Sequence, residues 1–517
     1  MSEEFVVQDQ SAIVSLLADP ATHGGVEPKR IDTHGAMVFI AGDRVYKVKR
    51  AVLFPFMDFS TPEKRHEALI EELRVNRRTA PSLYLGIAAI TDDAGSLRLG
   101  EIGEEVAQAV EYALVMRPFG ATLDDRAEAG ELSAADIAAV AEKIAAFHLE
   151  AEPVYRVDPA GRVADAIAGV IGEMRLNADL LDADKVDAFE AAMQNRHAAA
   201  SGTIRNRARL GLERHCHGDL HLRNICVLDG EPTLFDAIEF NPDFARIDVL
   251  YDLAFLLMDL EARGEGGLAN LTLNTYLDRR IAADWPDEAG LRLLPLFLAL
   301  RAGIRAEVSA HMAPVQSSAA ASERMQAEAA KRLDQALGYL APAQPRLIAI
   351  GGLSGSGKST LAGTLAPHIA PAPGARWLRS DVMRKALAGL EPSQRLPSDA
   401  YTPETSAQTY SSLLASAAAA LAAGHSVVLD AVFAKPNERT AAQAIAAQLG
   451  VPFTGIWLDA PVPTRAERVG SRRNDASDAG PAVAAAQAEY DLGPIAWHRI
   501  DASGGKTAVL EQARRLC

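Results

Sequence analysis

The sequence predicts two successive domains, an α+β domain followed by a doubly wound α/β domain. Short strand patterns fill roughly the first 120 residues and helical patterns dominate the region after them, which is the α+β order. The segment Ala341 to Pro345 then interrupts a helix, and beyond it strand and helix patterns alternate as they do around a parallel sheet. We therefore expect a first domain over 1–340, a linker over 341–345 and a second domain over 346–517, the first divided into an N-lobe of about 30–120 and a C-lobe of about 121–340.

The bulk composition restricts the class of protein. A chain of 517 residues is too long for one hydrophobic core, and 49% apolar with 23% charged residues is ordinary for a soluble globular protein. The formal net charge of −16 disfavours nucleic-acid and anionic-membrane partners, because both would be repelled. Three cysteines favour a reducing compartment, and neither a secretory leader nor an apolar run of about 18 residues is visible. We expect a cytoplasmic protein that acts on a small molecule, with the oligomeric state left open.

The first elements form a strand-rich unit. Ser11 to Ala18 fits a short amphipathic helix, and Met37 to Arg50 fits two strands joined at a Gly-Asp turn. Lys47 and Lys49 share one face of the second strand, although lysines are also common on solvated edge strands. A helix is expected over Pro62 to Ala80. Its glutamates that could meet one of these lysines are Glu67, Glu71 and Glu72.

The pattern turns helical from Ser133 onward. Ser133 with Asp136 fits an N-terminal cap, and the spacing of apolar residues after it fits a helix packed on a core. Residues 163–193 and 291–340 also fit helices. Between these helical stretches lies one segment of different composition.

This segment, Arg214 to Phe240, combines many polar side chains with short apolar runs. The polar residues are His217, Asp219, His221, Asn224, Asp236 and Glu239. Unpaired buried polar groups are costly, so this density favours a site. The spacing of Asp219, Asn224 and Asp236 is close to that of a protein-kinase catalytic loop, in which one carboxylate accepts the proton of the attacking hydroxyl and an amide and a second carboxylate hold Mg²⁺.

Two alternatives accompany this interpretation. Glu239 could take the metal in place of Asp236. A zinc site is a second alternative, but its candidate ligands are crowded without the usual paired spacing. Those ligands would be His215, Cys216, His217 and His221.

The motif His217-Gly218-Asp219-Leu220-His221-x-x-Asn224 resembles the HGDxHxxN motif of the aminoglycoside phosphotransferase family, relatives of the protein kinases. The resemblance covers roughly residues 30–310 and is strongest over 215–254. It implies a kinase-like fold, with Asp219 as the catalytic base and Asn224 and Asp236 as magnesium ligands. It also implies that Asp248 or Asp252 braces the catalytic loop.

The same resemblance assigns the rest of an ATP site. Lys47 would grip the α/β-phosphates with Glu72 as its helix partner, and Met116 to Phe119 would form the hinge beside adenine. Spacing alone leaves Lys49 as an alternative to Lys47, and Glu67 or Glu71 as alternatives to Glu72.

A glycine-rich loop follows the first strand of the second domain. The apolar run Leu347 to Gly351 leads directly into Gly352-x-x-x-x-Gly357-Lys358-Ser359. Backbone N–H groups can wrap an oligophosphate only where no Cβ blocks the approach, and the following helix presents its positive end. Lys358 would reach the β/γ-phosphates and Ser359 would hold Mg²⁺. The residues expected to bind ATP are Gly352, Ser354, Gly355, Ser356, Gly357, Lys358, Ser359 and Thr360.

Two aspartates stand at strand ends of this domain, where ligands of doubly wound sheets lie. Asp381 could take the acceptor's proton while Arg384 holds the acceptor, and Asp430 could act on Mg²⁺ through water. The alternative for each aspartate is an N-cap at a strand-to-helix turn. With Lys358, these residues complete the expected catalytic set.

A basic cluster follows the next strand. An arginine-bearing lid that closes on transferring phosphates would use such residues, although a solvated helix face would also carry them. The cluster comprises Arg465, Arg468, Arg472 and Arg473. With these arginines and Asp381-x-x-Arg384, the domain resembles small P-loop kinases such as gluconate kinase, chloramphenicol phosphotransferase and the zeta toxins.

The whole arrangement is similar to bacterial fusions of an aminoglycoside phosphotransferase domain with an ATP-binding P-loop domain. It implies a bifunctional, ATP- and Mg²⁺-dependent phosphotransferase. Each domain would transfer a γ-phosphoryl group to a small hydroxylated or phosphorylated metabolite or antibiotic, and the two could act in sequence. The alternative is one active kinase domain regulated by a partner that senses or hydrolyses nucleotide.

Overall fold

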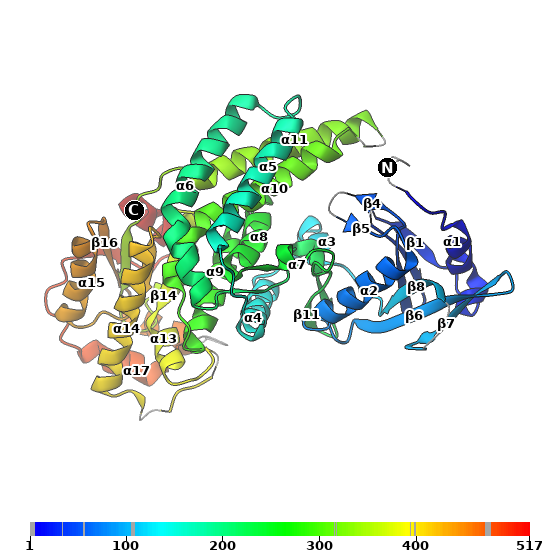
Figure 1. Ribbon diagram of the computed structural model, residues 1–517. Coiled ribbons are helices and arrows are strands. Elements are labelled where there is room, and N and C mark those ends of the chain that lie inside the picture. The colour runs from blue at the N-terminus through cyan, green and yellow to red at the C-terminus, as the bar shows by residue number, and fades with distance from the viewer. Residues whose placement is uncertain are drawn as a thin grey trace.

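The computed structural model describes residues 6–33, 35–54, 57–104, 109–314, 316, 318–392, 394–397, 400–470 and 477–517. Figure 1 shows an N-terminal sheet at one end (blue), a central body of helices (cyan to green) and a second α/β unit at the other end (yellow to red). The predicted two-domain order, α+β and then doubly wound α/β, is confirmed.

The N-terminal sheet has six strands in the order β1-β2-β3-β8-β6-β7, all paired antiparallel. Its elements are α1 (Ser11–Ala18), η2 (Pro20–His23), β1 (Lys29–Asp32), β2 (Ala36–Ala41), β3 (Arg44–Lys49), β4 (Leu53–Phe54), β5 (Met57–Asp58), α2 (Pro62–Asn76), β6 (Tyr84–Asp93), β7 (Ser96–Ile102) and β8 (Ala109–Met116). The expected helix at Ser11–Ala18 and the β2–β3 hairpin are confirmed.

Helix α2 ends earlier than the sequence predicted. Thr61 caps its first turn and Pro62 occupies the first helical position, as both residue types favour. The helix ends at Asn76 rather than Ala80, because Ala80 precedes a proline and the residue before proline avoids helical angles. This end places Glu72 and Asn76 on one buried face of α2.

The central body is mostly helical. Its elements are α3 (Leu123–Glu128), α4 (Ala134–Glu150), α5 (Pro159–Leu176), α6 (Ala183–Arg209), β9 (Glu213–His215), η3 (Leu222–Asn224), β10 (Ile225–Leu228), β11 (Glu231–Leu234), α7 (Pro242–Ala245), β12 (Arg246–Asp248), α8 (Val249–Ala262), α9 (Gly266–Ala282), η4 (Glu288–Leu293), α10 (Leu294–Met312) and α11 (Ala319–Leu340). The predicted cap of α4 is a full capping box between Ser133 and Asp136.

The second sheet has five strands in the order β14-β15-β13-β16-β17, and every pair is parallel. Its elements are β13 (Leu347–Gly351), α12 (Lys358–Leu365), η5 (Ala366–His368), β14 (Arg376–Arg379), α13 (Ser380–Leu387), α14 (Pro403–Ala422), β15 (Val427–Asp430), α15 (Pro436–Leu449), β16 (Phe453–Asp459), α16 (Val462–Gly470), α17 (Pro481–Ala486), η7 (Gln487–Glu489), β17 (His498–Asp501) and α18 (Lys506–Leu516). The helix expected over 358–369 changes at Ala366 from α to 3-10 geometry, one residue before Pro367.

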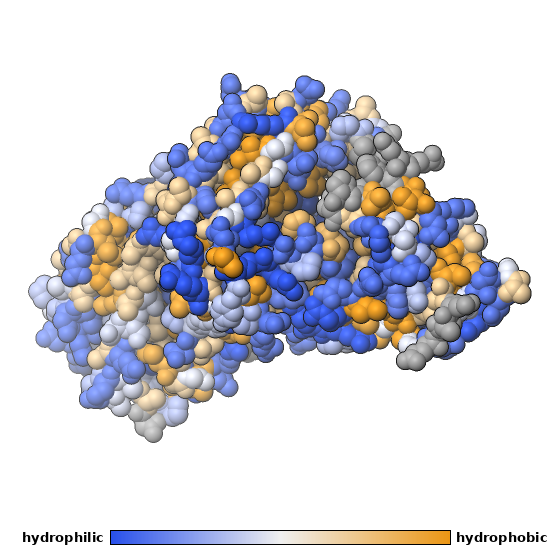
Figure 2. Space-filling model, in the orientation of Figure 1, coloured by the Kyte–Doolittle hydropathy of each residue, from blue (hydrophilic) through white to orange (hydrophobic). Residues whose placement is uncertain are grey.

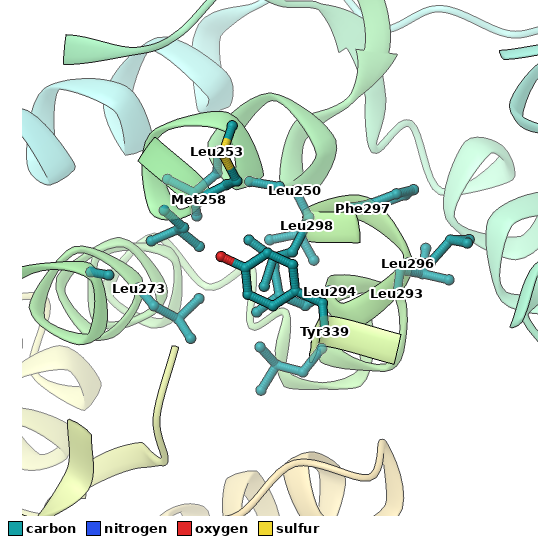
Figure 3. Packing of buried hydrophobic residues seen from close by; sticks show 14 of the residues in the cluster. Leu250, Leu253, Met258, Leu273, Leu293, Leu294, Leu296, Phe297, Leu298 and Tyr339 are labelled. Atoms are coloured by element: carbon teal, nitrogen blue, oxygen red, sulfur yellow. The ribbon is translucent and has the colours of Figure 1, made fainter. Parts of the chain in front are cut away.

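One core of buried apolar side chains extends through both domains. Figure 3 shows leucines of α8, α9 and α10 gathered with Tyr339 of α11. The same cluster continues into the second sheet through Leu347, Leu378 and Leu429. Burying one such side chain contributes about 1.5–3 kcal/mol. The second sheet is therefore attached to the helical body by packing as well as by the chain.

A buried ion pair lies at the contact between the domains, where α9 and η4 pack beside β14 and α14. Arg376 of β14 is fully buried, and its Nη2 lies 2.6 Å from Asp278 Oδ1 and 3.3 Å from Glu288 Oε1. Its Nη1 donates to Asn274 Oδ1 at 3.0 Å, and the same oxygen accepts from the backbone N–H of Trp377 at 2.7 Å. These contacts hold one strand of the second sheet against a helix of the first domain.

No helix among the described residues is long and apolar enough to span a bilayer. The face drawn in Figure 2 mixes hydrophilic and hydrophobic residues and is hollowed between the projecting helices α5 and α6 and the N-terminal sheet.

The domain contact predicts a large stability effect. Arg376→Met should lower the free energy of unfolding by about 3–5 kcal/mol, because Asp278 and Glu288 lose their buried counter-charge. Arg499→Met is a matched control, since the Arg499–Asp459 pair is exposed and should contribute at most about 1 kcal/mol. Urea unfolding of both variants measures the difference, and equal losses would contradict this account.

A second prediction concerns pH. His425 is buried and hydrogen-bonds the carbonyl of Gly374 at 2.9 Å, and burial lowers the pKa of its imidazole to about 4. The neutral form is favoured in the fold, so stability is full above about pH 6.5 and is lost as pH falls toward 4, by about 3 kcal/mol. His425→Gln should flatten this part of the profile. Urea unfolding of both proteins between pH 7 and 4 measures it; parallel profiles would exclude His425 as the cause.

Candidate functional site

A chain of charges joins three segments that are distant in the sequence. Lys47 Nζ of β3 lies 2.7 Å from Glu72 Oε1 of α2 and 2.8 Å from Asp236 Oδ1. Burial alone would lower the pKa of Lys47, but the carboxylates of Asp236 and Glu72 outweigh it and raise the pKa well above its usual value. Lys47 is therefore a fixed cation, as phosphate binding requires.

Helix α2 also shapes the loop that carries Asp236. Asn76 Oδ1 accepts from the backbone N–H of Ala237 at 2.8 Å, and the N–H of Asp236 donates to the Tyr84 hydroxyl at 3.1 Å. Asp236 itself has a left-handed backbone with φ of 60°, which is uncommon for a residue other than glycine and is held here by its neighbours.

Lys49 lies in the same cluster but in a different position. Its Nζ is 2.7 Å from Glu72 Oε2 and also pairs with Glu239. The Lys49 side chain is 4% exposed, against 16% for Lys47, and it lies over the ring of Phe59. Lys47 and Asp236 thus face outward, while Lys49 and Glu239 form the layer beneath them. This arrangement favours Lys47 and Asp236 for the two roles that spacing left open.

The predicted catalytic loop brings Asp219 and Asn224 together. Asn224 Nδ2 donates to Asp219 Oδ2 at 2.9 Å, and His221 Nε2 lies 3.3 Å from the same oxygen. Burial would raise the pKa of Asp219, but the nearby His221, His217 and Arg301 outweigh it and hold the pKa below its usual range. Asp219 is therefore an ionised acceptor at neutral pH. The amide oxygen of Asn224 is left as the atom that would hold a metal.

Asp252 holds this loop in shape. It is fully buried on α8 and accepts from the backbone N–H groups of His217 at 3.0 Å and Gly218 at 2.8 Å. His148 Nε2 lies 3.1 Å from the same carboxylate, and its other nitrogen hydrogen-bonds the Tyr276 hydroxyl of α9. Of the two bracing aspartates proposed from the sequence, Asp252 contacts the loop directly. Asp248 instead pairs with Arg207 at 2.7 Å.

The structure also shows where the predicted hinge and one candidate ligand of the alternative zinc site lie. Met116 is the buried last residue of β8, and Arg117 after it forms a double hydrogen bond with Asp229 at 2.9 and 3.1 Å. Cys216 is fully buried and its thiol donates to a backbone carbonyl at 3.5 Å, as expected of a small core residue.

The glycine-rich loop closes tightly between β13 and α12. A Cβ on Gly352 (φ 144°) would lie 2.8 Å from the carbonyl of Leu458, and one on Gly355 (φ 84°) 2.4 Å from that of Arg465. Both positions therefore require glycine. The Ser356 hydroxyl is buried without a hydrogen-bond partner among the described residues, and it lines a pocket of about 370 Å³ beside the loop.

Lys358 and Ser359 begin α12 beside the end of β15. Lys358 Nζ donates to the carbonyl of Leu353 at 3.3 Å. Asp430 is buried, and burial raises the pKa of its carboxyl, although Lys358, Arg379 and a hydrogen bond from Ser359 act in the opposite direction. Hydroxyl and carboxylate oxygens are the ligands that Mg²⁺ prefers. Ser359 and Asp430 thus fit this ion in the second domain, as Asn224 and Asp236 do in the first.

Asp381 and Arg384 lie in α13, directly after β14. Neither Asp381 nor Asp430 is an N-cap, because Arg379 holds that position before α13 and Lys435 before α15. Arg384 Nη1 donates to the Ser406 hydroxyl at 3.3 Å, and its guanidinium lies over the Tyr401 ring at 5.1 Å. Arg384 is thus held between α13 and the start of α14, with its Nε buried and without a hydrogen-bond partner among the described residues.

The structure separates the two described arginines of the basic cluster. Arg465 is buried and donates to the carbonyls of Ala460, Ser354 and Ala484, so it fixes the backbone around the loop. Arg468 lines the pocket, with its Nη1 3.9 Å from the Cβ position of Gly357. Arg472 and Arg473 lie outside the described residues. The roles assigned to all these site residues stay predictions.

Sequence reasoning missed the far wall of this pocket. It is formed by the turn between β17 and α18, which contributes Ala502, Gly504 and Lys506. Thr360 and Thr364 of α12 line the pocket as well. The Gly-Gly-Lys sequence at 504–506 was the only available signal, and it is too common to indicate a site alone.

The two lysines of β3 can be told apart by mutation. Lys47→Met should lower phosphoryl transfer by the first domain by about 100-fold or more, because a cation facing the phosphates is lost while Glu72 keeps Lys49. Lys49→Met should instead lower the free energy of unfolding by about 3–5 kcal/mol, because Glu239 and Glu72 lose a buried partner. Urea unfolding and transfer assays on both variants measure this. The reverse pattern would assign the phosphate to Lys49.

Comparisons with known proteins cover the whole chain and each domain. The profile of the family described as "AAA domain" matches residues 347–491. This match confirms the prediction that the C-terminal region is a P-loop kinase domain. The APS kinase CysC of Mycobacterium tuberculosis, in complex with AMPPNP and APS, is 22% identical over 34% of this chain and 98% of its own, with a TM-score of 0.26. Amicoumacin kinase hAmiN, in complex with AMP-PNP, Ca²⁺ and Ami, is 12% identical over 63% of this chain and 94% of its own, with a TM-score of 0.38.

A choline/ethanolamine kinase family protein from Mesorhizobium loti is 14% identical over 64% of this chain and 98% of its own, with a TM-score of 0.35. Among curated proteins, the uncharacterized proteins Rv2004c of Mycobacterium tuberculosis and Mb2027c of Mycobacterium bovis are each 32% identical over 501 residues, which are 94% of this chain and 94% of each relative. With this identity across nearly the full length of both chains, the protein belongs to the same family as these mycobacterial proteins.

Proposed function

We propose that the protein is a kinase with two separate ATP sites, each transferring the γ-phosphoryl group to a small acceptor. The observation that carries the proposal is the convergence of Lys47, Glu72 and Asp236 from three distant segments beside the Asp219 loop. Carboxylates gathered from distant segments around an outward-facing lysine are typical of a functional site rather than of core packing. The glycine loop with Lys358 and Ser359 supports a second site of the same kind.

In the first domain, Asp219 would accept the proton of the acceptor hydroxyl as its oxygen bonds to the γ-phosphorus and the bond to the β-phosphate oxygen breaks. Lys47 would hold the phosphates, and Asn224 and Asp236 would hold Mg²⁺. The ion would supply neutralisation of the charge on the phosphates. The ionised state of Asp219 supports its role as the proton acceptor.

In the second domain, the loop N–H groups and Lys358 would hold the phosphates, with Ser359 and Asp430 at Mg²⁺. Asp381 would take the acceptor's proton, and Arg384 would orient the acceptor. The buried Nε of Arg384, which has no hydrogen-bond partner in the part of the chain that the structure describes, supports the second role, because an anionic acceptor would complete its hydrogen bonds. We place both reactions in the cytoplasm, where the free thiols Cys216, Cys226 and Cys517 stay reduced.

The fusion supports sequential action, in which the first domain makes a monophosphate that the second domain phosphorylates again. The domain contact through Arg376 also favours a second candidate, in which one domain senses or hydrolyses nucleotide and regulates the other. ATP hydrolysis without an acceptor distinguishes them. Appreciable hydrolysis that depends on Lys358, with no transfer to a metabolite, would favour regulation.

Labelled phosphate transfer to a library of hydroxylated metabolites tests the proposal. Asp219→Asn should lower transfer by the first domain about 100- to 10,000-fold, because the general base is lost. Lys358→Ala should lower transfer by the second domain about 100-fold or more, because a cation facing the phosphates is lost. If either variant keeps full transfer of its own product, that site is assigned wrongly. If each variant leaves the amount of the other domain's product unchanged, and the two domains use unrelated acceptors, the hypothesis of sequential action is wrong.

A further inference from the structure

Two arginines of α10 point to the kind of acceptor that the first domain takes. Arg301 and Arg305 are four residues apart and therefore share one face of the helix, which packs against α8. Arg301 is 6% exposed, and its guanidinium lies 3.9 Å from the ring centre of Tyr251 and 4.8 Å from that of Phe255. Phe255 meets the ring of His221 edge-on at 5.1 Å. Arg301 and His221 thus contact the same aromatic ring, and His221 Nε2 lies 3.3 Å from Asp219 Oδ2.

The hydrogen bonds of Arg301 are incomplete. Its Nε donates to the carbonyl of Tyr251 at 3.2 Å, but its Nη2 is buried without a hydrogen-bond partner among the described residues. A buried guanidinium usually has its donors paired with acceptors, because the uncompensated charge is costly. An unpaired donor beside a candidate catalytic loop therefore suggests a partner that arrives with a ligand.

Arg305 lies one turn further along and is half-buried. Neither a hydrogen bond nor an ion pair joins it to another described residue. Burial and the neighbouring Arg332 lower the pKa of Arg305, and the carboxylates of Asp259 and Asp219 act in the opposite direction. Arg305 therefore lies one turn from Arg301 on the same face of α10, where Arg332 adds a further positive charge.

The acids around this face are already engaged by other arginines. Asp124 pairs with Arg223 at 2.9 Å and also with Arg263. Asp259 lies 3.6 Å from Arg263 and 4.0 Å from Arg332. The carboxylates of Asp124 and Asp259 are thus engaged by other arginines, whereas neither Arg301 nor Arg305 has an ion-pair partner among the described residues.

We propose that Arg301 and Arg305 bind an anionic group of the acceptor, a phosphate or a carboxylate, beside Asp219. The proposal rests on the proposed function of the first domain and narrows its substrate class. Guanidinium groups match both anions, with paired donors for two oxygens. An acceptor that carries several amino groups would be repelled from the same face. The first domain therefore selects an acidic hydroxylated metabolite rather than a polycationic antibiotic.

Calorimetric binding to the full chain tests this without knowledge of the natural acceptor. The protein is saturated with Mg²⁺ and a non-hydrolysable ATP analogue, so that both nucleotide sites are filled. It is then titrated at constant ionic strength with inorganic phosphate, acetate, glucose 6-phosphate, glucose and glucosamine. We expect phosphate or acetate to bind, with the stronger of the two identifying the anion, and glucose 6-phosphate to bind at least about tenfold more tightly than glucose or glucosamine.

Variants locate the binding. Arg305→Gln should weaken anion binding by about tenfold or more, and Arg305→Lys should keep part of it. Arg301→Lys provides a second test that keeps the charge in the core. Arg324→Gln removes one charge from an exposed position of α11 and serves as the matched control. Absence of anion binding, or equal binding by the Arg305→Gln and Arg324→Gln variants, overturns the proposal.

The outcome is separable from that of the proposed function. Binding that depends on the arginines, together with full transfer by Asp219→Asn, would retain the anion site and reject the catalytic role of Asp219. Loss of transfer in Asp219→Asn, together with the absence of arginine-dependent anion binding, would retain the catalytic role of Asp219 and reject the anion site.

Discussion

The buried carboxylate of Asp252 is the contact on which the geometry of the first site depends. It accepts hydrogen bonds from two successive N–H groups of the catalytic loop and is paired with His148. Burial alone would raise the pKa of Asp252, but the hydrogen bond from His148 and the nearby His148, His217 and Arg301 outweigh it and lower the pKa to about 2, so the carboxylate stays ionised. Through His148 and Tyr276 the same network reaches α9, which also carries Asn274 and Asp278, two of the acceptors of Arg376. The shape of the loop and the attachment of the second domain thus share one helix.

The two candidate sites differ in how they position the positively charged and N–H groups that would bind phosphates. The first surrounds Lys47 with carboxylates drawn from α2 and the Asp236 loop, so its geometry exists only when the N-terminal sheet and the helical body are assembled. The second uses backbone N–H groups of the loop between β13 and α12, which are contiguous in the sequence and are supported by Arg465 of α16. A change in packing between lobes should therefore affect the first site before it affects the second.

This difference explains how much could be predicted from the sequence. The glycine loop, the β2–β3 hairpin, the capping box of α4 and the alternating order of the second domain have local signatures, and the structure confirms their positions. Which glutamate meets Lys47 depends on which face of α2 is buried. The structure buries Glu72, whereas Glu71 Oε1 lies 2.5 Å from Arg74 Nη2. Arg376 lies in an ordinary strand pattern, and its partners are about 100 residues earlier in the chain, so no local signal could show that it is buried between domains. The burial of Arg465 under carbonyls was hidden for the same reason.

The Arg376 contact has a consequence for how such a chain arises and persists. If the polypeptide were cleaved between 340 and 346, one fragment would carry a bare guanidinium on a strand and the other would carry the two carboxylates and the amide that surround it. Cleavage and separation would also expose to water the apolar side chains of the shared core, such as Leu347 and Leu378, so the fragments would tend to reassociate rather than diffuse apart. The two domains should therefore be retained together, because losing either one would lower the stability of the other.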